Sequence, residues 1–257
     1  MDHGNLELWV AVVGAGAWIP QIVGWVHALA VRPRIAVYQA ASVEVGFTNE
    51  GPALAVPVVL RVRNKDCVVT EAAPRVQHGQ GETHEMRWRW VSEVKGFMSG
   101  IPNIEPIAFQ QADPAIAVAL TPRDVTTRTV NFREVGFEDE MQRHIASVTR
   151  AIEGVEGENR TSVREWRDAT QWYRSSFFWR EGTYSVEVAF SSSDAPEPAK
   201  LSFSFNLTRP DVARIQANVE ALVGQTEAAA RAGNDLAAWI PNPPIKWAWC
   251  RPTITPR

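Results

Sequence analysis

The strongest constraint on this chain is a run of 24 residues, from Leu8 to Val31, that contains no formally charged side chain. A helix rises about 1.5 Å per residue, so this run would extend over roughly 36 Å, and the hydrocarbon core of a bilayer is about 30 Å thick. The sequence therefore predicts one transmembrane helix over residues 8–31, followed by a soluble domain over residues 35–257.

Four side chains in the predicted span are expected to contact lipid or a partner helix. Pro20 should kink the helix, and Gln21 beside it offers an amide for a hydrogen bond to another helix. Trp18 lies too far from both ends for an interfacial belt and should face lipid or a partner. His27 is an ionisable group inside the span, which makes it a functional candidate, although it lies near enough to the end to reach the interface.

Two other interpretations of this run have less support. A dinucleotide-binding turn would explain Gly14 and Gly16, but Ile19 replaces its third small residue and the next strand-like run has no acidic residue at its end. A cleaved signal peptide needs a basic N-terminal region and a shorter apolar run, whereas this chain begins with Asp2 and Glu7.

The orientation of the span follows from its flanks. Arg32 and Arg34 come directly after it, and no Lys or Arg precedes it. The positive-inside rule then places the soluble domain in the cytoplasm. Two cysteines, Cys67 and Cys250, suit a reducing compartment. The reversed topology would make the domain periplasmic, where these two cysteines could pair.

Composition excludes several functional classes. A net charge of −3 and a pI near 6.0 leave no electrostatic footprint for binding nucleic acid. The sequence has no phosphate-binding G-x-x-x-x-G-K, no G-x-S-x-G, no H-E-x-x-H and no cysteine pair at zinc spacing. No cofactor and no catalytic residue is predicted.

Alternating apolar residues predict antiparallel strands through the first half of the soluble domain. Pro57 argues that its own strand is an edge strand or contains a bulge. Residues 92–112 are expected to be a long irregular connection. The predicted strands cover residues 43–47, 56–62, 68–69, 84–90 and 116–120.

The apolar period then changes to that of helices. Residues 138–178 are expected to form a helical hairpin, with its second helix capped by Thr161 or Ser162. Strands return at 184–190 and 201–207, a last helix begins at Thr208 and should stop at Gly224, and the tail alternates again. The pattern predicts an immunoglobulin-like antiparallel β-sandwich with a helical-hairpin insertion and a C-terminal helix.

One polar constellation surrounds the predicted turn after His78. Two imidazoles and a carboxylate, from His78, His84 and Glu82, would be able to hold a divalent metal. The alternative is a solvated hairpin tip with His84 turned inward beside Trp88, and this interpretation is favoured.

Eight stretches spread along the chain carry a resemblance to known sequences. They are WIPQIVGW, RIAVY, EVGFTNEGPAL, RNKD, THEMRW, FFWREGTYSVEVAF, FSFNLTRPDVARIQANVEAL and KWAWCRP. The chain resembles an uncharacterised family of bacterial single-pass membrane proteins with an N-terminal span and a strand-rich soluble domain. The resemblance is weak over residues 92–175, and Cys250 stands where an aromatic residue is expected. It implies bacterial origin and a membrane anchor, but no activity.

The sequence supports one leading hypothesis about function and two alternatives. The leading one is a membrane-anchored cytoplasmic module, touching the lipid bilayer through its span, that binds a partner protein. The first alternative is an enzyme or metal-binding protein that uses His78 and His84. The second is a periplasmic binding module, if the topology is reversed.

Overall fold

The computed structural model describes residues 18, 20–26, 31–79, 81–98, 107–114, 117–232 and 245–256. The fold is mainly β, and the strand pairs within these ranges are antiparallel, as predicted. The strands are β1 (Arg34–Gln39), β2 (Glu44–Thr48), β3 (Gly51–Arg63), β4 (Cys67–His78), β5 (Thr83–Met98), β6 (Ile107–Pro114), β7 (Val118–Leu120), β8 (Thr126–Glu134), β9 (Gly182–Ser192), β10 (Ala199–Leu207), β11 (Trp249–Cys250) and β12 (Ile254–Pro256). The helices are α2 (Phe137–Ala151), the 3-10 helix η1 (Gly157–Ser162), α3 (Arg164–Ser175) and α4 (Arg209–Arg231).

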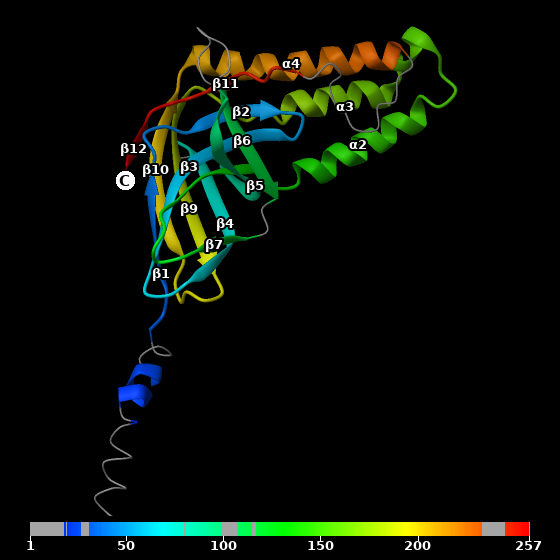
Figure 1. Cartoon of the computed structure of the whole chain (residues 1–257). Coiled ribbons are helices and arrows are strands. Elements are labelled where there is room, and N and C mark those ends of the chain that lie inside the picture. The colour runs from blue at the N-terminus through cyan, green and yellow to red at the C-terminus, as the bar shows by residue number, and fades with distance from the viewer. Residues whose placement is uncertain are drawn as a thin grey trace, which may run out of the picture.

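The described strands join into one strongly curled sheet (Figure 1). Their order is β11-β2-β3-β8-β5-β4-β9-β10-β12, with β1 beside β3, β6 beside β5 and β7 beside β4. The predicted immunoglobulin-like sandwich is therefore not confirmed, since a sandwich needs two separate facing sheets. Register shifts interrupt β4 and β5, and such bulges increase the local twist and bend a sheet.

The C-terminal tail connects the two edges of the curled sheet. At one end of the tail Trp249 pairs with Gly46 in β2, and at the other Ile254 pairs with Phe205 in β10. The Trp249 ring lies flat against Gly46, where a Cβ atom would come within 2.6 Å of it. The path of strands thus begins and ends in one short segment, which closes this part of the sheet.

Two strand predictions need correction. Pro57 does not lie in an edge strand, because β3 has β8 on one side and β2 followed by β1 on the other. Its missing N–H falls where the neighbour changes from β2 to β1, next to the hydrogen bond from the Ala40 N–H to the Pro57 carbonyl. Residues 92–112 are not a purely irregular connection either, since they contain the end of β5 and most of β6.

The helical predictions are confirmed in outline. The predicted insertion at 138–178 corresponds to α2, η1 and α3, between β8 and β9. The cap of α3 is Val163, so neither Thr161 nor Ser162 caps it. Thr208 and Asp211 form the capping box that starts α4. This helix continues past Gly224 to Arg231, since buried side chains such as Val223 offset the roughly 1 kcal/mol cost of a helical glycine.

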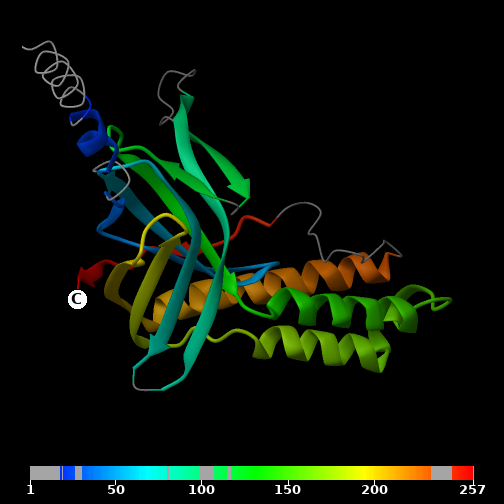
Figure 2. The same ribbon diagram turned by 90° about the horizontal axis from the view of Figure 1, so that it is seen from below.

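Three consecutive carbonyl groups of β2 hold the helical part of the chain. The Trp179 indole N–H donates to Gly46 O at 2.9 Å, Asn218 Nδ2 to Phe47 O at 2.9 Å, and the Tyr173 hydroxyl to Thr48 O at 2.7 Å. All three donors are buried. The helices consequently pack at one end of the sheet and project beyond it (Figures 1 and 2).

The N-terminal helical residues 18 and 20–26 lie beyond the other end of the sheet (Figures 1 and 2). Trp18, Ile22, Val23, Trp25 and Val26 are all more than half exposed. Within the described residues, no helix combines the length and apolar character that a membrane crossing requires. Most of the predicted span, including His27, lies outside the described residues, so the span stays a prediction.

Candidate functional site

The candidate site is a depression of about 500 Å³ at the helical end of the sheet. We call it the rim groove. The end of β8, the β4–β5 turn, the start of α2 and the end of α3 surround it. The residues that matter for its chemistry are Glu82, His84, Glu134, Trp172, Phe178 and Arg180.

Glu134 places a carboxyl group on the apolar face of β8. It lies directly opposite Met86 of β5, which is buried, and residues directly opposite share a face. Phe132 and Val130, two and four positions earlier in the strand, are buried on the same face. The Glu134 side chain is 26% exposed, so its carboxyl group has lost much of its water.

The rim groove shifts the protonation of two groups. Burial, and then the charge of Glu82, raise the pKa of Glu134 to about 7. The His84 ring stacks on Phe178 at 3.7 Å between centroids, and burial lowers the pKa of His84. His84 Nδ1 lies 3.5 Å from Glu134 Oε1. Near pH 7 the groove therefore holds a neutral imidazole beside a partly protonated carboxyl group.

Aromatic walls and paired charges complete the groove. The Trp172 ring contacts Phe137 at 5.0 Å and His144 at 4.8 Å between centroids. On the rim, Arg180 Nη2 lies 3.8 Å from Glu82 Oε2, and Glu140 forms an ion pair with Arg143. The charges of Glu82 and Glu140 are thus balanced by arginines, which leaves Glu134 as the carboxyl group of the groove that a positively charged ligand would suit.

The predicted metal constellation does not assemble as a single site. His78 Nε2 is 3.1 Å from the Glu181 carbonyl, and its ring contacts Tyr184. Gly182 makes room for this ring, because a Cβ atom there would lie 2.7 Å from His78 Nε2 and its φ is +131°. His84 turns inward, as the favoured interpretation holds. In the parts of the chain that the structure describes, no three His, Cys, Asp or Glu side chains are grouped to hold a metal.

The residues predicted to contact membrane or partner are exposed where they are described. Trp18, Pro20 and Gln21 lie on the exposed N-terminal helix, and Arg34 is exposed at the start of β1. Cys67 and Cys250 are both buried and free. Burial raises the pKa of each thiol, that of Cys250 to about 11, so neither is poised to react.

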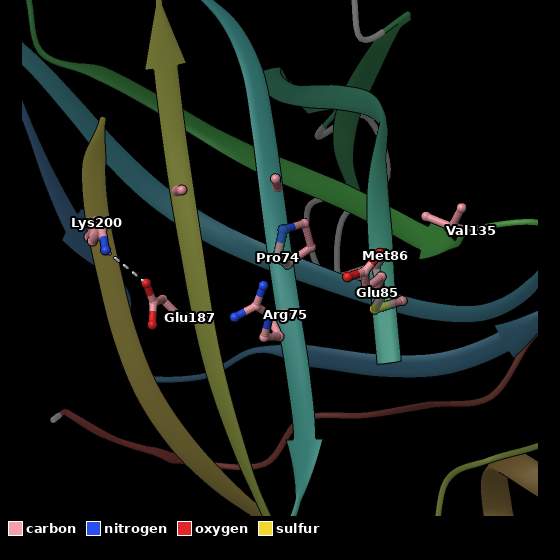
Figure 3. A pocket seen from close by; sticks show the side chains of 9 residues that line it. Pro74, Arg75, Glu85, Met86, Val135, Glu187 and Lys200 are labelled. Carbon is pink, nitrogen blue, oxygen red and sulfur yellow. Dashed lines mark ion pairs between the residues drawn. The ribbon is translucent and has the colours of Figure 1, made fainter. Parts of the chain in front are cut away.

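A second depression, of about 440 Å³, lies on the outer face of β10, β9, β4 and β5 (Figure 3). Its charges alternate across the strands: Glu85 is opposite Arg75, Arg75 is opposite Glu187, and Lys200 forms a 3.2 Å ion pair with Glu187. Alternating charges on an open sheet face stabilise strand pairing. This surface is therefore explained without a ligand.

Sequence reasoning named His84 and Glu82 as metal candidates, in the interpretation that was not favoured, and did not name Glu134. Residues 126–134 were not predicted as a strand, because buried polar side chains, Asn131 and Arg133, alternate with Val130 and Phe132. The signal that would have found the site is the continuation of that apolar alternation onto Glu134.

Neither the protein-family models nor the curated proteins contain a match to this chain. Among solved structures, it is similar to a family 123 glycoside hydrolase from Clostridium perfringens, studied for glycolipid glycan hydrolysis, with 8% identity and a TM-score of 0.32. The match covers 70% of this chain and 28% of that one. At this TM-score the likeness carries no argument about fold or activity.

Replacing Glu134 with Gln is expected to stabilise the protein at about pH 8 and to have little effect at about pH 5. A carboxyl whose pKa is raised from 4.5 to about 7 on folding costs stability as pH rises through that window, by up to about 3 kcal/mol. The Tm gain of E134Q at the higher pH should be roughly 5 °C or more. E158Q, at an exposed position of η1, is the control. An equal gain at both pH values would contradict the burial of Glu134.

Proposed function

We propose that this protein is a membrane-anchored binding module whose rim groove takes a basic side chain of a partner protein. The observation that carries the proposal is Glu134, a carboxyl group with a raised pKa on an apolar face beside aromatic rings. An incoming guanidinium or ammonium group would favour the ionised form of Glu134. Its attraction to the carboxylate would be strengthened by the partial burial of that group.

The walls of the groove support a cation rather than a neutral or anionic ligand. Trp172 lines the groove, and a cation beside an aromatic ring gains about 0.5–2 kcal/mol. Glu82 pairs with Arg180 and Glu140 with Arg143, so these charges balance each other and Glu134 is the carboxyl group that the ligand would meet.

The anchoring part of the proposal rests on the N-terminal segment. The uncharged run at 8–31, the exposed apolar side chains of its described helical residues and the basic flank at Arg32 and Arg34 all favour a span in the bacterial inner membrane with a cytoplasmic domain. The helices, of which α2 and α3 line the rim groove, lie at the end of the sheet away from residues 18 and 20–26 (Figure 2). The groove would then open away from the membrane, toward partners.

The two alternatives have less support. An enzyme or metal site at His78 and His84 lacks a third ligand among the described side chains, and His78 instead contacts the Glu181 carbonyl. A periplasmic module would be supported by a disulfide between Cys67 and Cys250, but both cysteines are free.

The cation-binding role is tested with a minimal probe, N-acetylarginine methylamide, against its neutral glutamine counterpart. The arginine probe should shift the indole N–H resonance of Trp172, assigned with W172F, and bind with a Kd on the order of 1 mM or tighter. Binding should strengthen from about pH 5.5 to pH 8, because the cation competes with the proton on Glu134. E134Q should abolish the difference between the probes. Equal binding of both probes to the unaltered protein would refute the proposal.

A further inference from the structure

Three arginines gather on one outer face at the end of the sheet opposite the rim groove. Arg34 of β1 is directly opposite Arg63 of β3, and Arg61 is two residues before Arg63. Directly opposite residues, and residues two apart, share a face of a sheet. All three are exposed, whereas Val62 between Arg61 and Arg63 is buried on the other face. We call this surface the arginine face.

The arginine face is electrostatically unfavourable as it stands. Like charges directly opposite each other in a sheet destabilise strand pairing. In the described parts of the chain, no carboxylate lies within ion-pair distance of Arg34, Arg61 or Arg63. On the other outer face, by contrast, Arg75 has Glu85 and Glu187 directly opposite on its two sides. Strand stability thus does not explain the arginine face, and an anionic ligand would relieve its repulsion.

The arginine face lies close to the N-terminal helical residues, and this position indicates which kind of anion it binds. β1 follows the N-terminal helical residues by a short segment, in which Arg32 is also exposed. Asn64 Nδ2 donates to the Arg32 carbonyl at 3.2 Å, so the turn after β3 is tied to this segment. Asp66 and Asp194 lie at the same end, where they line a depression together with Arg32 and Lys65. The exposed helical residues 18 and 20–26 thus lie beyond the end of the sheet at which β1 begins (Figure 1).

We propose that the arginine face binds the headgroups of an anionic phospholipid bilayer and so lays β1 and β3 against the membrane surface. An apolar helix followed at once by basic residues is the arrangement that places cations at the level of lipid phosphates. Arg is suited to phosphate because its planar guanidinium donates two parallel hydrogen bonds. The inference rests on the membrane location in the proposed function and is independent of the rim groove. A nucleic acid is disfavoured by the net charge of −3.

The experiment measures arginine accessibility in the full-length protein reconstituted in nanodiscs. Phenylglyoxal labels exposed guanidinium groups, and mass spectrometry reports each site. Phosphatidylcholine discs are compared with discs that also contain phosphatidylglycerol. We expect labelling of Arg34, Arg61 and Arg63 to fall at least threefold with the anionic lipid and to recover at high salt. Arg164, whose side chain is 82% exposed at the far end of the molecule, is the control and should not change.

A flotation assay separates this inference from the anchoring proposal. If the chain floats with neutral vesicles, the N-terminal anchor holds, and the labelling result alone decides about the arginine face. If it floats only with anionic vesicles and R34Q/R61Q/R63Q abolishes this, the arginine face binds lipid although the anchor fails. Each arginine near a surface should contribute roughly fivefold to such binding. Labelling that is equal in both lipids, or is blocked by added RNA but not by anionic lipid, overturns the inference.

Discussion

Deleting the tail, residues 245–257, is expected to abolish the cooperative unfolding transition of the protein. The tail pairs with β2 through Trp249 and with β10 through Ile254, so its loss exposes both edges of the curled sheet. It also removes Cys250, which is buried, and the apolar packing of Trp247 against the core.

The expected loss of stability is large because the tail also completes a buried hydrogen-bond network. Asn218 of α4 donates to the Ala248 carbonyl at 2.8 Å and accepts from the Ala248 N–H at 2.9 Å. Without the tail, this buried amide loses two of its three partners, at a cost of about 1–3 kcal/mol for each group left unsatisfied. The partly buried indoles of Trp247 and Trp249 are lost as well, and each contributes up to about 3 kcal/mol. The sum approaches the 5–15 kcal/mol that stabilises a typical domain.

Thermal unfolding followed by tryptophan fluorescence and circular dichroism checks this expectation. W247A should lower the Tm clearly, whereas K246A, at the neighbouring residue, should leave it almost unchanged. A deletion variant that keeps a sharp transition near the original Tm would show that the sheet does not depend on the tail for closure.

Replacing Trp179 with Ala is expected to lower the free energy of unfolding by about 3–5 kcal/mol. Trp179 is 1% exposed, and its ring contacts Phe178, Tyr184 and Phe205. Its indole N–H also donates to the Gly46 carbonyl, which links the segment after α3 to β2. Both the packing and this hydrogen bond are lost in the variant.

Two Trp-to-Phe variants separate the hydrogen bond from the packing. W179F keeps most of the ring but loses the hydrogen bond to the Gly46 carbonyl, so it should cost about 1 kcal/mol or more. Trp88 is the matched control, because its buried indole N–H has no hydrogen-bond partner among the described residues. W88F should therefore cost clearly less than W179F in urea unfolding. Equal costs would mean that the bond to Gly46 contributes nothing.

The candidate site was only partly accessible to sequence reasoning. His84 and Glu82 belong to a turn that local patterning indicates, and the inward position of His84 follows from its alternation with exposed residues. Glu134 joins them through the pairing of β5 with β8, across a long sequence separation. Its raised pKa depends on burial by segments from other parts of the chain, which no local pattern contains.

The sequence by itself determined the elements whose period comes from one solvated face and one buried face. It predicted β2, β9 and β10, the helical hairpin and the capping box at Thr208, because local sterics and side-chain alternation are sufficient for these. It also predicts the N-terminal span, which still awaits its test.

Only the tertiary structure decided how the strands close. Short alternating strands suit a sandwich and a curled sheet equally well, because both bury one face of each strand. The choice depends on which edges pair, and here the tail joins β2 to β10 while three carbonyls of β2 hold the helices. Hydrogen bonds between segments so distant in sequence do not affect the apolar pattern of either segment. The closure of the sheet and the position of the rim groove could therefore not be predicted from the sequence.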